Sequence, residues 1–244
     1  MLFACHNKAA FAALGVLQAR RMLYLFDIDG TLIGGDGSGR RAFERACAEV
    51  LRVEHALSHI KLDGMTDPLI LDAAFEEHTG RRPTEAESAQ IFTAYVHYLE
   101  DEVARGLYHV KPAVTETLTF LEARGACVGL ATGNLEAGAR IKLTRGDLWR
   151  RFPFGGYGSD ARARGHLVKR AIERGEAHAG RAFQGHEVVV IGDTPHDIAA
   201  AHACGAFALA VATGGDSVDT LRAAGADVAF ETLEELPRWL ETVL

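Results

Sequence analysis

The stretch Leu23-Tyr24-Leu25-Phe26-Asp27-Ile28-Asp29-Gly30-Thr31-Leu32-Ile33 decides how the rest of the chain can fold. Leu23–Phe26 is bulky and largely apolar, which predicts a short buried strand of a parallel sheet. Asp27 and Asp29 follow at once, and Gly30 permits a tight exit of the backbone. In open α/β sheets the carboxyl end of a strand faces the ligand crevice, so both carboxylates are candidate functional groups. A buried carboxylate pair is costly unless a cation or a proton compensates the charge.

The composition is that of a globular chain, long enough for one large domain or for a core with an inserted module. The sequence has 244 residues, 48% of them hydrophobic, and a formal net charge of -7 at pH 7. This mildly acidic balance argues against nucleic acid or a membrane surface as the main partner. The cysteines form no C-x-x-C pair and the histidines show no metal-binding spacing. We therefore expect a protein of the reducing cytoplasm.

Residues 1–21 precede the organising strand, and we interpret them as an N-terminal extension. Ala9–Leu17 is apolar but too short to span a bilayer. The basic pair Arg20-Arg21 after it counts against a signal peptide. The extension is therefore either an appended helix or the product of a start codon assigned too far upstream. If it is dispensable, a chain beginning at Met22 should fold and keep its activity.

The stretch that follows the organising strand carries helical patterns and no convincing strand. Apolar side chains recur at helical spacing over Arg40–Val53. A second helix is expected from Thr66-Asp67-Pro68 to Gly80, because a threonine cap followed by proline is typical of a helix start. A third, longer helix is expected to begin at Pro83-Thr84.

The position of these helices predicts two domains. Residues 22–35 and 109–244 are expected to form an α/β core. Residues 36–108 are expected to form a helical domain inserted into it. Residues 1–21 stand outside both.

Two further apolar runs predict strands whose carboxyl ends carry polar motifs. Cys127–Ala131 ends at Thr132-Gly133-Asn134, where a hydroxyl and backbone N–H groups before a helix suit phosphate binding. Val188–Ile191 leads to Asp193, and Asp197 lies one helical turn further on, so both can face one point. Alone, the first motif is an ordinary turn and Asp197 a favourable charge at a helix N-terminus.

The rest of the chain alternates strands with helices. Further strands are predicted over residues 152–157, 206–211 and 227–230. Further helices are predicted from Pro112 to Gly125 and over residues 137–143, 167–174 and 233–243. This order predicts the fold class α/β, with a doubly wound parallel sheet and an inserted helical domain.

Taken in order from Met22 onward, the motifs resemble the haloacid dehalogenase (HAD) superfamily, whose members are mostly phosphatases. Residues 27–32 are similar to its motif I, residues 132–134 to motif II and residues 192–197 to motif IV. Each motif follows a predicted strand, which makes the combination specific. The resemblance implies a HAD-like, Rossmann-type core with residues 36–108 as a small helical cap of type C1. It suggests a phosphoglycolate phosphatase-like enzyme, with phosphoglycolate as the first substrate to test.

The resemblance also implies roles for individual residues. Asp27 would be the nucleophile and Asp29 the general acid and base. Carboxylates this close need a hard cation, and Mg²⁺ fits. The implied ligands are the Asp27 and Asp193 carboxylates and the Asp29 backbone carbonyl, with Asp197 acting through water. The residues implied to hold the phosphate are Thr132, with Gly133 and Asn134 beside it.

A cation near Asp27 and the phosphate would reduce repulsion among the carboxylates, and two residues compete for this role. Arg164 precedes the helix that leads to the motif IV strand, which is where the family usually has its motif III cation. Lys142 lies on the helix after motif II. The family more often uses lysine followed by proline, and Arg164-Gly165 departs from that pattern. We favour Arg164, with Lys142 as an auxiliary or structural neighbour.

Thr66 and Asp67 have two interpretations that can hold together. They are a helix cap, and in a HAD cap such a loop contacts the leaving group of the substrate. The expected partner of the protein is a small phosphorylated metabolite, and the expected oligomeric state is a monomer or a homodimer.

The expected function is Mg²⁺-dependent hydrolysis of a phosphomonoester through an aspartyl phosphate. Family dehalogenases and phosphonatases lack the second aspartate, so Asp29 argues against both. A sugar phosphomutase keeps both aspartates and remains an alternative, as does a catalytically idle binding module.

Overall fold

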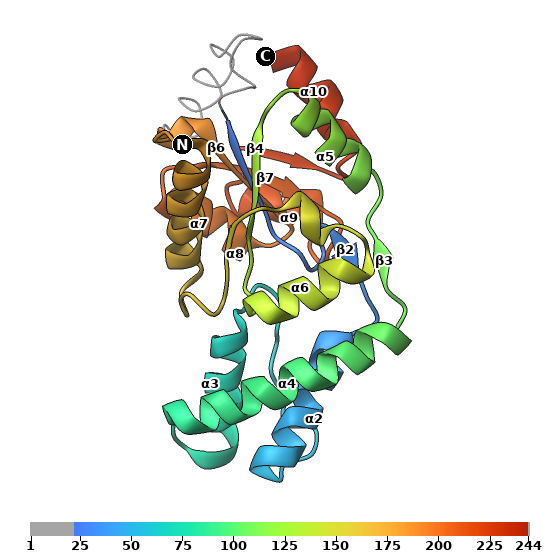
Figure 1. Ribbon diagram of the computed structural model, residues 1–244, viewed down its shortest axis with the longest axis vertical. Coiled ribbons are helices and arrows are strands. Elements are labelled where there is room, and N and C mark those ends of the chain that lie inside the picture. The colour runs from blue at the N-terminus through green and yellow to red at the C-terminus, as the bar shows by residue number, and fades with distance from the viewer. Residues whose placement is uncertain (1–21, 244) are drawn as a thin grey trace.

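The computed structural model describes residues 22–243, and the prediction for residues 1–21 lies outside them. A parallel sheet of six strands forms the core (Figure 1). Its strands are β1 (Leu23–Phe26), β4 (Cys127–Ala131), β5 (Gly155–Gly156), β6 (Val188–Gly192), β7 (Phe207–Val211) and β8 (Val228–Phe230). Their order is β5-β4-β1-β6-β7-β8, so the strand that ends at Asp27 lies in the centre.

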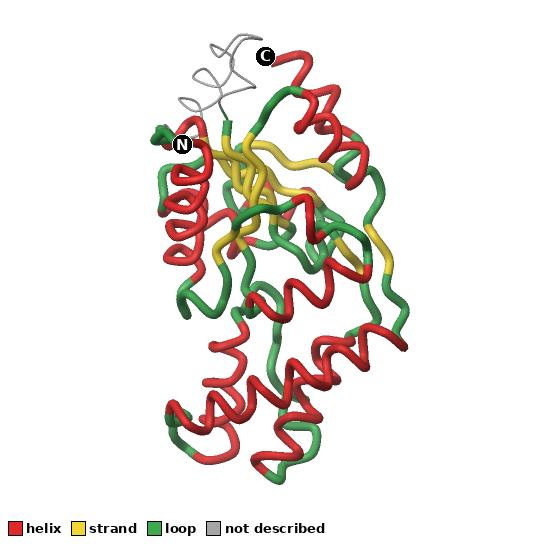
Figure 2. The backbone as a smooth tube through the Cα atoms, in the orientation of Figure 1, coloured by secondary structure: helices red, strands yellow, loops and turns green. Residues whose placement is uncertain are grey.

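Helices cover both faces of this sheet (Figures 1 and 2). The helices packed on one face are α5 (Val114–Ala123), α6 (Glu136–Arg145) and α10 (Glu235–Val243). Those packed on the other face are α7 (Arg164–Ala179), α8 (Pro195–Ala203) and α9 (Val218–Ala223). Single turns of 3-10 helix lie at Trp149–Arg151 and Gly185–Glu187.

Successive side chains of β1 enter different hydrophobic clusters. Tyr24 and Phe26 pack with α5, α6 and α10, whereas Leu23 and Leu25 pack with α7, α8 and α9. Side chains alternate across a strand, so a central strand that is apolar throughout must be buried on both faces. The α/β doubly wound sheet predicted from the sequence is confirmed.

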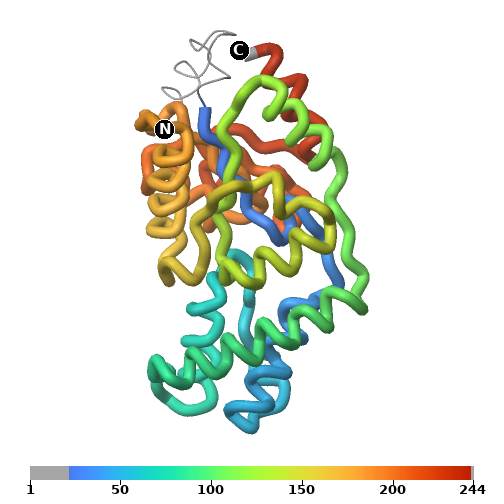
Figure 3. Tube along the Cα trace, viewed as in Figure 1, coloured from blue at the N-terminus to red at the C-terminus, as the bar shows by residue number. Residues whose placement is uncertain are grey.

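Three of the four helices between β1 and β4 lie apart from the sheet (Figure 3), and they form a hydrophobic cluster of their own. They are α2 (Ser38–Leu51), α3 (Asp67–Thr79) and α4 (Glu85–Arg105). We call residues 35–108 the helical insert. The chain enters and leaves the insert through an antiparallel pair, β2 (Ile33–Gly34) and β3 (His109–Val110). The exact domain boundaries remain a prediction.

Local signals explain where the insert helices begin and end. Thr66 caps α3 by accepting a hydrogen bond from the backbone N–H of Leu69, and Gly80 ends that helix with φ 69°. Thr84 forms a capping box with Glu87 at the start of α4. No helix between residues 22 and 243 is both long and apolar enough to cross a membrane.

Some expected element ends were wrong by a few residues, and backbone conformation explains two of them. The first insert helix ends at Leu51 rather than Val53, because Arg52 is left-handed with φ 59°. The helix expected from Pro112 begins at Val114, because Ala113 has φ 58°. The short strands β2 and β3 were missed, since two residues are too few for a periodic pattern.

Candidate active site

Three neighbouring strands bring their polar ends to one edge of the sheet. Asp27 follows β1, Thr132 follows β4 and Asp193 follows Gly192, the last residue of β6. A cavity of about 520 Å³ opens between this edge and the helical insert. Asp27, Asp29 and Asp193 line its core side. The sequence therefore placed the motifs correctly relative to one another, at the carboxyl edge of a parallel sheet.

The first part of the site is a cluster of carboxylates. Asp27, Asp193 and Asp197 are all buried, and one oxygen of each lies within 4.8 Å of the others. The hydroxyl of Thr31 donates to Asp193 Oδ1 at 2.8 Å. Gly30 has φ 83°, and a Cβ atom there would lie 2.2 Å from Asp193 Oδ2, so glycine is needed on both counts.

The electrostatics of this cluster favour a cation. Burial raises the pKa of Asp27, and Arg164 opposes that rise. Burial, and then the charge of Asp27, raise the pKa of Asp193. Buried oxygen donors whose ionisation is this costly fit a hard divalent ion such as Mg²⁺.

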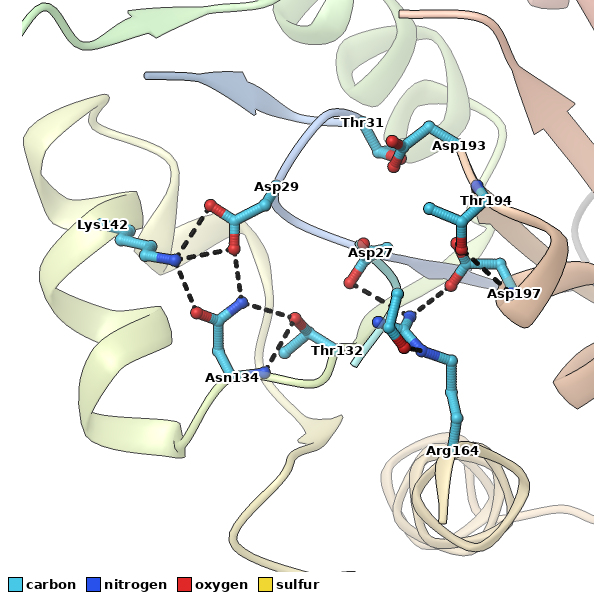
Figure 4. A network of polar contacts seen from close by, with 11 residues as sticks. Asp27, Asp29, Thr31, Thr132, Asn134, Lys142, Arg164, Asp193, Thr194 and Asp197 are labelled. Atoms are coloured by element: carbon cyan, nitrogen blue, oxygen red, sulfur yellow. Dashed lines mark hydrogen bonds and ion pairs between the residues drawn. The ribbon is translucent and has the colours of Figure 1, made fainter. Parts of the chain in front are cut away.

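Arg164 is the first residue of α7, and its side chain is only 10% exposed and lines the cavity. Its Nη1 forms an ion pair with Asp197 Oδ1 and lies 3.5 Å from Asp27 Oδ1 (Figure 4). Burial acts to lower the pKa of the guanidinium, but Asp197 and Asp27 raise it further above its ordinary value. The Nε of Arg164 donates to the carbonyl oxygen of Gly64 in the helical insert at 3.3 Å.

The second part of the site surrounds Asp29. Lys142 Nζ donates to both Asp29 oxygens, at 2.9 and 2.7 Å, and Asn134 Nδ2 donates to Asp29 Oδ2 at 2.7 Å (Figure 4). Lys142 also donates to Asn134 Oδ1 at 2.6 Å. Burial would raise the pKa of Asp29, but the Lys142 ammonium and these hydrogen bonds lower it. Arg164 and Lys142, the two candidates for the cation near the phosphate, thus lie beside different aspartates.

The motif after β4 joins these two parts and meets the helical insert. Asn134 Nδ2 also donates to the hydroxyl of Thr132 at 2.9 Å. Thr132 is fully buried beside the cavity, whereas Gly133 and Asn134 line it. A Cβ atom on Gly133 would lie 2.5 Å from the carbonyl oxygen of Met65, so the insert approaches this loop closely.

The insert residues singled out in the sequence differ in their placement. Asp67 lines the cavity, and its Oδ2 accepts a hydrogen bond from the backbone N–H of Leu135 at 2.8 Å. Burial raises the pKa of Asp67 to about 6, although Lys142 lowers it in part. Thr66 is fully buried, is not among the residues that line the cavity, and donates its hydroxyl to the carbonyl oxygen of Arg162 at 2.8 Å.

The hydrogen-bond partners that orient the candidate site residues were not predicted from the sequence. Thr194 donates its hydroxyl to Asp197 Oδ2 at 2.7 Å and completes a capping box at the start of α8. The spacing Thr-x-x-Asp is a readable signal for this contact. Thr31, which donates to Asp193, lies within residues 27–32, but its contact with Asp193 was not predicted. Gly64 could not have been found, because its role depends on a backbone carbonyl and a distant partner.

The comparisons with known proteins agree with this fold. Residues 22–205 match the family model of haloacid dehalogenase-like hydrolases, so the chain belongs to this family. The chain is 27% identical over 219 residues to the probable phosphatase IndB of Dickeya dadantii (strain 3937), covering 88% of this chain and 91% of that protein.

Two solved structures show the same fold at lower identity. A predicted phosphoglycolate phosphatase from Haemophilus somnus has a TM-score of 0.68 and 18% identity, covering 90% of this chain and 98% of that one. A provisionally assigned beta-phosphoglucomutase from Bacteroides vulgatus has a TM-score of 0.66 and 20% identity, covering 97% of each chain. The protein is thus a hydrolase of the HAD family, and its fold is shared with proteins described by different activities.

Proposed function

We propose that the protein is a Mg²⁺-dependent phosphatase that hydrolyses a small phosphomonoester through an aspartyl phosphate. The observation that carries this proposal is the different surroundings of Asp27 and Asp29. Asp27 faces the carboxylate cluster and Arg164, whereas Asp29 faces Lys142 and Asn134. The two aspartates therefore have different surroundings, which supports different roles for them: Asp27 as a nucleophile beside a metal site, and Asp29 as a carboxylate held in a fixed orientation beside it.

Asp27 is the proposed nucleophile. A carboxylate oxygen of Asp27 attacks phosphorus, the bond to the leaving oxygen breaks, and an aspartyl phosphate forms. Asp27 is buried and held in place by the strand that it ends, so it loses little freedom when substrate binds. Arg164 lies beside it and can pair with phosphoryl oxygens in a bidentate manner.

Asp29 is the proposed general acid and base. In its protonated form it gives its proton to the departing oxygen, and it then takes a proton from the water that attacks the aspartyl phosphate. That second step releases inorganic phosphate and restores Asp27. Lys142 and Asn134 orient the Asp29 carboxylate for both steps.

The remaining motif residues are proposed to bind the phosphoryl group and the metal. Thr132, Gly133 and Asn134 would present hydroxyl and N–H donors to the phosphoryl oxygens. The Asp27 and Asp193 carboxylates and the Asp29 carbonyl would hold Mg²⁺, with Asp197 acting through water. When bound, Mg²⁺ would neutralise phosphate charge that the carboxylates would otherwise repel.

The name of IndB supports phosphate monoesters as the class of substrate. The likeness to a predicted phosphoglycolate phosphatase makes phosphoglycolate the first compound to test. The likeness to a provisionally assigned beta-phosphoglucomutase keeps a sugar phosphomutase as the alternative, because that chemistry uses the same two aspartates.

The test is phosphate release from a panel of small phosphomonoesters, with p-nitrophenyl phosphate as a generic substrate, in Mg²⁺ and in EDTA. We expect Mg²⁺-dependent release by the wild type and none by Asp27→Asn, because an amide is not a nucleophile. Asp29→Asn should also lose turnover but still bind Mg²⁺. Turnover of Asp27→Asn at the wild-type rate would refute the mechanism.

Two other outcomes would identify the alternatives. Conversion of a sugar phosphate to its isomer without net release of phosphate would indicate a mutase. Binding of phosphate without any turnover would indicate an idle binding module.

A further inference from the structure

The helix that carries Arg164 begins without a capping side chain. The N-cap residue of α7 is Ala163, which offers no side-chain acceptor, whereas α3, α4, α8 and α9 each have a threonine or serine in this position. A helix start leaves backbone groups without partners inside the helix, so it relies on surrounding groups to fix it. In this protein, residues of the helical insert help to hold the start of α7 in place.

Two insert residues hold Arg162, which lies two positions before Arg164. The hydroxyl of Thr66 donates to the carbonyl oxygen of Arg162 at 2.8 Å. Asp72 Oδ2, on α3, accepts from Arg162 Nε at 3.0 Å. Thr66 is fully buried and the Asp72 side chain is only 10% exposed, so both partners are fixed by the packing of the insert.

The insert also touches the side chain of Arg164 itself. The carbonyl oxygen of Gly64 accepts from Arg164 Nε at 3.3 Å, which leaves the Nη atoms to face the carboxylates. Gly64 has φ 70°, and a Cβ atom there would lie 2.4 Å from Cδ2 of His196 at the start of α8, so the insert approaches the core closely at this point. Backbone and side chain of the arginine region are thus both anchored to residues 64–72.

From these contacts we propose that Thr66 and Asp72 are positioning residues for Arg164. They act through Arg162, so that the Arg164 guanidinium is held in its phosphate-binding position only when the helical insert is docked on the core. The proposal rests on the proposed function, in which Arg164 binds the phosphoryl group. By linkage, phosphate bound at Arg164 favours the docked insert to the same extent that docking favours phosphate binding.

The test is a set of double-mutant cycles with Arg164→Ala. The substitutions are Thr66→Val, Thr66→Ser and Asp72→Asn, each made with Arg164 present and with Arg164→Ala. The measured quantities are kcat/KM for p-nitrophenyl phosphate and the dissociation constant for inorganic phosphate by calorimetry, both in Mg²⁺. The second measurement needs no turnover. Thermal unfolding checks that each variant is folded.

With Arg164 present, Thr66→Val should lower kcat/KM about tenfold, because it removes the hydrogen bond that fixes the carbonyl of Arg162. Thr66→Ser keeps the hydroxyl and should restore most of the activity. Asp72→Asn should cost about threefold, since Arg162 is partly solvated and such pairs are weak. In the Arg164→Ala protein, the same substitutions should change neither quantity by more than about twofold, because the group that they position is gone.

Arg82→Ala is the matched control. Arg82 Nε lies 4.0 Å from the same carboxylate oxygen of Asp72, but its side chain is 77% exposed and does not lead to Arg164. Its removal should leave both quantities unchanged. Thr66→Val also removes the cap of α3, so Asp72→Asn, which keeps the shape of the side chain, provides the independent test if that variant does not fold.

Equal losses with and without Arg164 would overturn the proposal, because they would show that Thr66 and Asp72 only stabilise the insert. Wild-type phosphate binding and turnover in Arg164→Ala would overturn it as well, since there would be no functional cation to position. A failure of the proposed function has a different signature, which is turnover that survives in Asp27→Asn. The phosphate-binding cycle would still decide the proposal in that case.

Discussion

Replacement of Asp67 by asparagine should stabilise the protein, and increasingly so as the pH rises. Asp67 is 6% exposed at the start of α3, and burial raises the pKa of its carboxyl from 3.8 to about 6. A folded-state pKa above the unfolded value means that the folded protein favours the neutral form. The stabilising contribution of Asp67 is therefore fully present below about pH 4 and is lost as the pH rises through about 6.

The size of the effect follows from the shift. A rise of about two pKa units corresponds to about 3 kcal/mol of lost stability once the carboxyl is ionised. Asparagine has almost the same shape, keeps an oxygen for the N–H of Leu135, and carries no charge to bury. The free energy of unfolding of Asp67→Asn minus that of the wild type should grow by about 2 kcal/mol between about pH 4 and about pH 7.

Urea unfolding followed by circular dichroism, at a series of pH values, measures this difference. The matched control is Asp63→Asn, because Asp63 is exposed in the same segment of the insert. For that control we expect only a small difference, because Asp63 buries no charge. A constant difference for Asp67→Asn, or one that falls as the pH rises, would refute the assignment of a buried and costly carboxylate at the insert–core contact.

Other substitutions test the site itself. Arg164→Ala should lower kcat/KM by an amount that corresponds to a loss of roughly 2 to 4 kcal/mol of transition-state stabilisation, as for loss of a preorganised donor. Lys142→Ala should lower kcat/KM less. If steady-state kinetics show the opposite order of the two losses, Lys142 rather than Arg164 is the cation that binds the phosphate. Mg²⁺ at about 100 times its dissociation constant should stabilise the wild type by about 2.7 kcal/mol and stabilise Asp193→Asn much less, and a thermal shift that is equal for both would contradict the metal site. Gly133→Ala should raise KM for p-nitrophenyl phosphate, because its Cβ would lie 2.5 Å from the Met65 carbonyl oxygen; an unchanged KM would show that the insert is not closely docked in solution.

Much of the core could be predicted because its signals are local. An apolar run of four or five residues that ends in an aspartate or threonine is readable as a buried strand with a functional end, as Asp27 and Thr132 illustrate. Parallel topology then brings such ends to one edge without further information. The start of α3 was readable for a similar reason, since Thr66 and Pro68 are local helix signals.

Contacts between distant segments could not be predicted. Lys142 is 113 residues from Asp29, and nothing in either segment indicates the other as its partner. Thr66 was expected to be a cap and a substrate contact, but its hydroxyl is committed to the Arg162 carbonyl, 96 residues away. Such contacts depend on how the insert docks, which is set by the packing of whole helices rather than by a motif.

The pairing of Lys142 with Asp29 bears on what the enzyme can cleave. The pKa of Asp29 is lowered by the Lys142 ammonium, so the carboxylate is favoured over the acid that the proposed first step requires. A leaving group that departs readily as an anion needs little protonation, whereas an alkoxide needs a full proton transfer. If Asp29 is the proposed acid, substrate binding is expected to weaken the Lys142–Asp29 contact for alkyl phosphates. A leaving oxygen placed between the two side chains would do so by competing for the ammonium. Loss of Asp29 should accordingly harm the hydrolysis of alkyl phosphates more than that of p-nitrophenyl phosphate.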